Sequence, residues 1–174
     1  IDKYASYCKD YAYLDFNDLI IKSLAILKKK PEILTSIQNT YKHILVDEFQ
    51  DVNTLQIDFL NSVISSETQL FCVGDDWQSI YGFRGSEVKY IVNFDTYFPH
   101  SEVIKFDLNY RSNDTIVKAS NRVIRFNRNL IDKEIKAFRE QDKRKIYLYS
   151  AQLEEEDGVN FLLYKLDELC RHGY

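Results

Sequence analysis

The chain has 174 residues, 45% of them hydrophobic and 29% charged, which is typical of a globular protein and not of a disordered one. Its formal net charge of -4 argues mildly against a domain that holds nucleic acid by bulk positive charge, although a protein that stacks on bases can tolerate it. No apolar run approaches the ~20 residues that a membrane-spanning helix needs. The length suits one domain or parts of two.

The cysteines also limit the class of protein. Cys8, Cys72 and Cys170 lie far apart and form no CxxC pair. This spacing predicts neither a disulfide framework nor a zinc site. We therefore expect a cytoplasmic protein in a reducing compartment.

The first 40 residues predict three packing helices with no chemistry of their own. Apolar and aromatic residues recur at helical spacing from Tyr4 to Tyr11. Asp15 is expected to cap a second helix with leucine and isoleucine on one face at 19–27, and Pro31 to begin a third.

A strand–helix–strand pattern follows. A short apolar strand at 44–46 precedes a helix with apolar residues at 55–64, and a second apolar strand occupies 70–73. This βαβ order predicts two parallel strands in an α/β fold.

Acidic residues stand directly after both predicted strands. Asp47 and Glu48 follow the first, and Asp75 and Asp76 follow the second. Because parallel strands place their carboxyl ends at one edge, where α/β sheets bind ligands, we expect these four side chains to converge on one crevice. Mg²⁺ carrying phosphates suits such a group, with one carboxylate holding the metal and a neighbour accepting a proton from water.

The second half of the chain alternates strands and helices again. The charge and apolar patterns predict these elements in order: a helix capped by Ser86 over 88–92, a strand at 103–108, a polar turn at 109–112, a helix at 116–124, a basic irregular connection at 128–145, a strand at 146–150 and a last helix at 154–169.

Four strings resemble motifs of the UvrD/Rep-like superfamily 1 DNA helicases. Residues 45–51 read LVDEFQD and are similar to their Walker B segment, motif II. Residues 73–86 read VGDDWQSIYGFRGS and resemble motif III. Residues 109–112 read NYRS and resemble motif IV, and DFNDL at 15–19 resembles a segment ahead of motif II. Their order and spacing carry the resemblance, and the DDWQ variant at 75–78 resembles helicase-IV-like members.

The resemblance implies a nucleotide site for ATP and Mg²⁺. By it, Asp47 would coordinate Mg²⁺ with Glu48 nearby, and Glu48 would polarise the hydrolytic water. Gln78 would sense the γ-phosphate and link its loss to DNA contacts. Tyr110 would stack on adenine, and Arg111 would act as an arginine finger, a role that suits its planar fork.

The resemblance also implies a DNA contact in the motif III string. Aromatic faces stack on single-stranded bases without reading sequence. Phe83 is the expected stacking residue, and Tyr81 the expected coupling residue. Arg84 could reach a phosphate or brace the loop, and both alternatives stay open.

The sequence contains no GxxxxGK[ST] string, so the loop that cradles the phosphates of ATP is absent from these residues. We therefore expect an internal fragment of a RecA-like P-loop NTPase, a parallel sheet flanked by helices. Residues 1–102 would be the later part of the first motor domain, and residues 103–174 the start of the second. The fragment alone is expected to be inactive.

The function implied for the parent protein is an ATP-dependent helicase or translocase, moving 3′ to 5′ on single-stranded or partly duplex DNA in replication, repair or recombination. One alternative is the motor segment of a helicase–nuclease subunit. A second is a non-catalytic interaction module that lost the P-loop, and a third is an unrelated α/β protein that binds another phosphate ligand.

Overall fold

The computed structural model describes residues 2–128, 130–139, 146, 148 and 155–173. The chain divides into two compact units. The first unit comprises Ile1–Lys105 with Asn127–Asp132, and the second comprises Phe106–Phe126 with Lys133–Tyr174. Each unit has its own parallel strand pair, and the two are described separately below.

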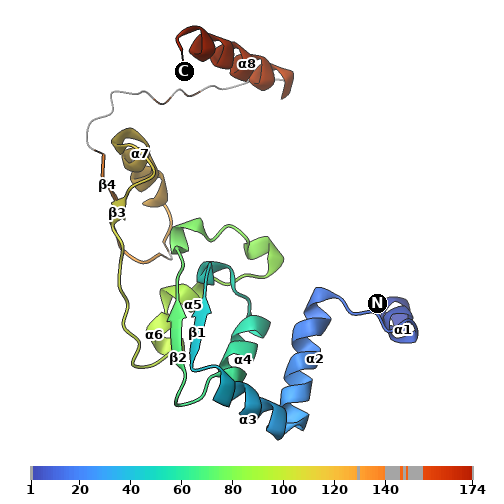
Figure 1. Cartoon of the computed structure of the whole chain (residues 1–174). Helices are drawn as coiled ribbons and strands as arrows, with labels where there is room; N and C mark the ends of the chain where they lie inside the picture. Colours follow the sequence, from blue (N-terminus) through green and yellow to red (C-terminus); the bar gives the residue numbers. More distant parts are fainter. Residues whose placement is uncertain (1, 129, 140–145, 147, 149–154, 174) are drawn as a thin grey trace. The chain divides into compact units, whose positions relative to one another are not determined.

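Three helices open the first unit, as the sequence predicts. They are α1 (Asp2–Asp10), α2 (Phe16–Lys29) and α3 (Pro31–Thr40) (Figure 1). The predicted cap is confirmed, because Asp15 accepts a hydrogen bond from the backbone of Asp18. Pro31 stands at the start of α3, where its missing N–H costs no helical hydrogen bond.

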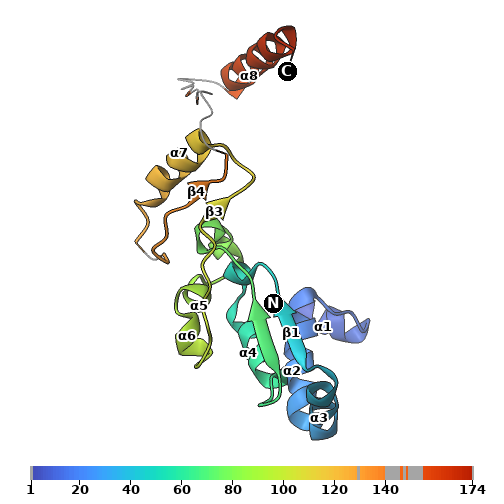
Figure 2. The same cartoon turned by 60° about the vertical axis from the view of Figure 1, so that its left-hand side comes forward.

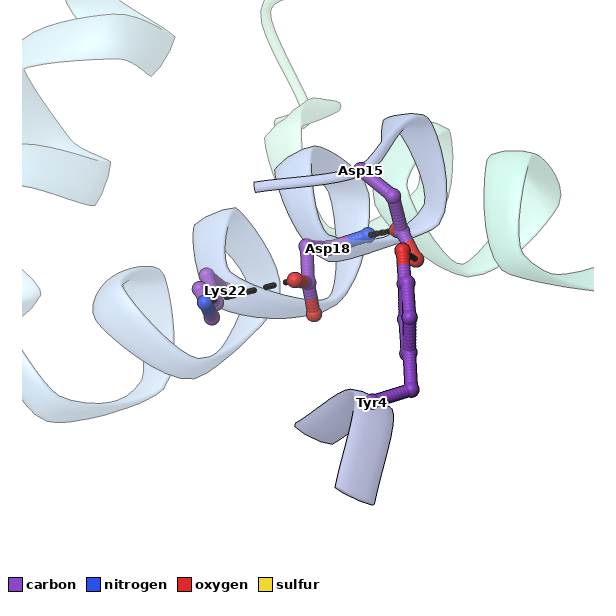
Figure 3. A network of polar contacts seen from close by, with 4 residues as sticks. All are labelled: Tyr4, Asp15, Asp18 and Lys22. Atoms are coloured by element: carbon purple, nitrogen blue, oxygen red, sulfur yellow. Dashed lines mark hydrogen bonds and ion pairs between the residues drawn. The ribbon is translucent and has the colours of Figure 1, made fainter. Parts of the chain in front are cut away.

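A small polar network joins α1 to α2 (Figure 3). The Tyr4 hydroxyl donates to Asp15 Oδ2 over 3.1 Å, and Asp15 Oδ1 accepts from the Asp18 backbone N–H over 2.7 Å. Asp18 in turn pairs with Lys22, with 3.4 Å between Oδ2 and Nζ. The Asp18 N–H is the main reason that the pKa of Asp15 lies below its ordinary value, and the cap is therefore strongest when Asp15 is ionised.

The predicted βαβ unit is confirmed. Strand β1 (His43–Val46) leads through α4 (Thr54–Val63) to β2 (Gln69–Cys72), and the strands pair in parallel with Val46 opposite Cys72. Asn53 and Gln56 form a reciprocal capping box at the start of α4. This box fixes where the chain leaves the β1 end and enters the helix.

The core of the first unit lies between α4, the β1–β2 pair and the short helices that follow. Phe49, Ile57, Leu60 and Tyr90 are buried together there, and Figures 1 and 2 both show α4 alongside the two strands. The strands alternate, so the opposite face presents the cross-strand pair of Leu45 and Phe71, which are 74% and 59% exposed. One face of this parallel pair is thus covered and the other is open.

Short helical turns carry the chain beyond the strands: η1 (Phe49–Asp51), η2 (Asp76–Gln78), η3 (Gly82–Arg84), α5 (Lys89–Val92) and α6 (Phe94–Tyr97). The prediction that Ser86 caps a helix is wrong. Helix α5 begins after Val88 with no side-chain cap, and the Ser86 hydroxyl is buried without a hydrogen-bond partner in the described structure.

The second unit pairs β3 (Leu108–Asn109) with β4 (Lys136–Ala137) in parallel, beside α7 (Asp114–Ile124). The buried Asn121 of α7 accepts from the Ile135 N–H and donates to the Ile135 carbonyl, which holds the β4 segment to the helix. In the predicted strand at 103–108 only Leu108 is in a strand, and β4 lies within the connection that was expected to be irregular. A two-residue strand has no apolar alternation to reveal it.

The last helix is confirmed as α8 (Glu155–Arg171). Most of the strand predicted at 146–150 lies outside the described residues. Among the helices described, none is long and apolar enough to cross a bilayer.

Candidate active site

The end of β1 places two carboxylates on an unusual backbone. Asp47 directly follows the strand, and its Oδ1 accepts the Glu48 N–H over 2.9 Å. Glu48 adopts the left-handed conformation, with φ 50° and ψ 43°. A residue with a Cβ is disfavoured there by about 1–2 kcal/mol, and such strain is commonly stored at functional sites. Both side chains are exposed, so they are available to a ligand.

Gln50 connects this end of β1 to the end of β2. Its side chain is buried, with only 2% of its surface exposed. Its Nε2 donates to Glu48 Oε2 over 2.7 Å and lies 3.4 Å from Asp51 Oδ2. Its Oε1 accepts the backbone N–H of Asp75 over 2.9 Å. Gln50 is not among the predicted site residues, although a glutamine within an otherwise acidic and apolar string is a usable signal.

The chain of hydrogen bonds continues along the end of β2. Asp75 Oδ2 accepts from Gln78 Nε2 over 2.7 Å, and its Oδ1 accepts the Trp77 N–H over 3.2 Å. Glu48, Gln50, Asp75 and Gln78 therefore form one continuous series across both strand ends. Of the four acidic residues predicted to converge, Glu48 and Asp75 are joined in this way, through Gln50.

Asp76 has a different environment from the other three acids. It is 3% exposed, and its Oδ2 accepts the Ile131 N–H over 2.7 Å. This carboxylate begins η2 and anchors the 127–132 segment of the same unit. The contact described for Asp76 therefore stabilises the fold of the first unit.

Gly74 permits the close approach of the two strand ends. A Cβ added at Gly74 would lie 2.8 Å from Gln50 Oε1, 3.1 Å from the Gln50 nitrogen and 2.8 Å from Ile91 Cδ1. Because real contacts of a Cβ are essentially never below 3.0 Å, any other residue would displace Gln50 or Ile91. A substitution at Gly74 would therefore disturb the packing of the Gln50 side chain.

The predicted DNA-contact residues share one exposed turn. Phe83 is 80% exposed and Tyr81 38% exposed, with 6.1 Å between their ring centroids. The Arg84 guanidinium carbon lies 5.1 Å from the Tyr81 centroid and 5.5 Å from the Phe83 centroid. Arg84 thus braces the two rings by cation–π contacts, which favours one of the alternatives left open.

The predicted residues of the NYRS string lie in the second unit, directly after β3. Asn109 Oδ1 accepts the backbone N–H groups of Arg111 and Ser112 over 3.0 and 2.7 Å, which makes a tight turn. Tyr110 is 63% exposed, and its ring centroid lies 4.8 Å from that of Phe138. Arg111 is exposed. The turn fixes the backbone of both residues and leaves both side chains accessible.

Comparison with known proteins assigns the family. Residues 1–99 match the model of the UvrD/REP helicase N-terminal domain. The chain therefore belongs to the UvrD/REP helicase family. It is 35% identical over 160 residues to the ATP-dependent DNA helicase PcrA of Staphylococcus aureus, covering 92% of this chain and 22% of the relative. It is 38% identical over 158 residues to a probable DNA helicase II homolog of Rickettsia felis, covering 91% of this chain and 24% of the relative. The chain thus spans about a quarter of the length of these relatives.

Proposed function

We propose that this chain is a segment of a longer ATP-dependent DNA helicase and that the β1–β2 edge contributes the hydrolytic residues of its nucleotide site. The observation that carries the proposal is the placement of Glu48 beside Asp47, at the joined ends of two parallel strands and hydrogen-bonded through Gln50. Relatives bear the names of ATP-dependent DNA helicases, which supports ATP as the nucleotide and DNA as the substrate. The proposed direction of movement is 3′ to 5′.

The proposed fold of the parent is RecA-like, with residues 1–102 in the first motor domain and 103–174 in the second. Parallel sheets occur almost only with both faces covered. The open face at Leu45 and Phe71 supports the proposal that further segments pack on this strand pair.

The proposed roles at the β1 end follow from the donor set. Asp47 offers exposed carboxylate oxygens, the ligand type that Mg²⁺ takes in ATPases beside phosphate oxygens and water, so the residue fits the metal. Bound Mg²⁺ would neutralise charge on the phosphates. Glu48 is the proposed general base, and its carboxylate would accept a proton from the attacking water.

Three further residues complete the proposed nucleotide chemistry. Gln78 would sense the γ-phosphate, and its link to Asp75 gives it a path to the β1 end. Tyr110 would stack on adenine, and its exposed ring suits that contact. Arg111 would stabilise charge in the transition state as an arginine finger.

The exposed turn at η3 is the proposed contact for single-stranded DNA. Phe83 presents the larger accessible aromatic face, which is the property that base stacking requires. Tyr81 and Arg84 would hold that face in place, because the guanidinium contacts both rings.

The experiment is the ATPase activity of the complete protein, with and without single-stranded DNA, beside its Glu48→Gln variant. We expect strong stimulation by DNA and a loss of about 10²–10⁴-fold in kcat in the variant, the usual contribution of a general base. The 174-residue chain by itself is expected to hydrolyse ATP negligibly, because it contains no GxxxxGK[ST] loop. An inactive complete protein would favour a non-catalytic interaction module instead.

A further inference from the structure

Gln50 carries a buried side-chain amide whose oxygen and nitrogen both make hydrogen bonds. Its Oε1 accepts from Asp75 N–H, its Nε2 donates to Glu48, and its backbone carbonyl accepts from the Ser79 hydroxyl over 3.2 Å. Burying an amide without partners is unfavourable, whereas a fully satisfied buried network is rigid. The Gln50 side chain therefore links the segments that follow the two strands, through a hydrogen bond to a residue 25 positions away in sequence.

The orientation of this amide is decided by the groups that its oxygen and nitrogen contact. The Asp75 N–H can only donate, so it must face the oxygen of the amide. The carboxylate oxygens of Glu48 and Asp51 accept hydrogen bonds and face the nitrogen, at 2.7 and 3.4 Å. The reversed amide would lose both hydrogen bonds at once. A single orientation thus presents a donor to Glu48.

Glu48 needs such a donor because its side chain is otherwise poorly constrained. It is exposed, and a free glutamate side chain samples many rotamers. A hydrogen bond from a buried amide selects one position for Oε2. Because glutamine is neutral, it leaves the charge of the carboxylate in place, whereas a lysine or arginine would compensate that charge.

We infer that Gln50 is a positioning residue, which holds the Glu48 carboxylate in its reactive orientation by anchoring it to the backbone at the end of β2. The inference rests on the proposed role of Glu48 as the base. In this inference Gln50 acts through Glu48 and not directly on the nucleotide. Gly74 makes the arrangement possible, since a Cβ there would occupy the space of the Gln50 side-chain oxygen.

The test is steady-state ATPase of the complete protein with saturating oligo(dT), comparing wild type with Gln50→Glu. This variant keeps an acceptor for the Asp75 N–H but turns a carboxylate oxygen toward Glu48, and also toward Asp51, so that like charges repel. We expect kcat to fall about 10- to 100-fold, the range typical of residues that orient a catalytic group, with KM for ATP within about twofold.

The double variant Glu48→Gln/Gln50→Glu separates positioning from a general effect on folding. If Gln50 acts through Glu48, the second substitution adds little to the loss already caused by Glu48→Gln. Losses that multiply fully would overturn the inference. Should Gln50→Glu be unfolded, Gln50→Met removes both polar atoms without adding charge and enters the same cycle.

Gln38→Glu is the matched control. Gln38 is a partly buried glutamine that also bridges elements, because its Nε2 donates to the carbonyls of Ser62 and Ile64, but it lies outside the candidate site. We expect it to change the thermal midpoint and leave kcat unchanged. A wild-type protein without ATPase would overturn the proposed function and this inference together. An active wild type whose kcat is preserved in Gln50→Glu overturns the inference alone.

Discussion

The two strand pairs of the molecule support their candidate residues in different ways. At the end of β1 and β2, Glu48 and Gln78 have their side chains tied into one hydrogen-bonded series. After β3, the Asn109 turn holds only the backbone of Arg111, and Tyr110 has a ring neighbour but stays 63% exposed. In the first region the hydrogen bonds hold the candidate side chains in place. In the second region they hold the backbone that carries the candidate side chains.

This difference has a consequence for function. A general base must lie within hydrogen-bond reach of the proton that it accepts. A carboxylate that is already held in position therefore increases the rate of hydrolysis. An arginine that serves as a finger can be exposed first and become ordered when the phosphates are bound. The comparison therefore predicts that substitutions in the two regions differ in their kinetic signatures.

Arg111→Ala is the substitution expected to have the largest effect. In the complete protein we expect kcat to fall about 10³–10⁵-fold, the usual contribution of an arginine finger, with little change in thermal stability because the side chain is exposed. Steady-state ATPase and thermal unfolding measure both. Arg125→Ala is the control, since Arg125 is exposed in the same unit and pairs with Glu134. Equal kcat in the two variants would contradict the proposed role of Arg111.

Phe83→Ala tests whether exposure at η3 serves DNA binding. Losing one stacked base should weaken the binding of single-stranded DNA by about 1–3 kcal/mol, roughly 5- to 150-fold in Kd. Fluorescence anisotropy with a labelled dT oligomer at one fixed salt concentration measures this change. Phe126, 88% exposed, provides the matched variant Phe126→Ala, for which we expect an unchanged Kd. The same loss in both variants would assign the effect to general exposure of aromatic rings.

Alanine substitutions of the two helix caps, Asn53 and Asn113, should have the smallest effects and test whether the first region is the more rigid one. Asn53 caps α4 within a reciprocal box, whereas the cap at α7 is a hydrogen bond from the Ile116 N–H to Asn113. We expect the free energy of unfolding to fall by about 1 kcal/mol in Asn53→Ala and by less in Asn113→Ala. Urea unfolding monitored separately for each unit by hydrogen exchange distinguishes the two. A larger loss at Asn113 would reverse the order of local stability proposed here.

The sequence was sufficient to predict the βαβ unit, because the apolar runs at β1 and β2 and the long amphipathic stretch of α4 are local patterns. Parallel pairing places the two strand ends at one edge, as predicted, but it does not bring all four acidic side chains together, because Asp76 is buried and accepts the Ile131 N–H. The sequence could not predict the Gln50–Asp75 contact, which depends on side-chain geometry between distant positions. The left-handed backbone of Glu48 and the two-residue β4 likewise leave no periodic signal. The roles of Asp47, Glu48, Gln78, Arg111 and the other candidate residues stay predictions.

Gly74 is a position where a substitution would disturb the candidate site, although the residue itself is exposed. It is exposed and has no proposed contact with a substrate, so its exposure alone does not mark it as a residue of the site. Yet the space beside it is filled by the Gln50 amide oxygen and by Ile91. A chain that kept its acidic residues but replaced this glycine would have to move Gln50 or Ile91. Such a substitution would reach the carboxylates indirectly, through the amide that links the two strand ends.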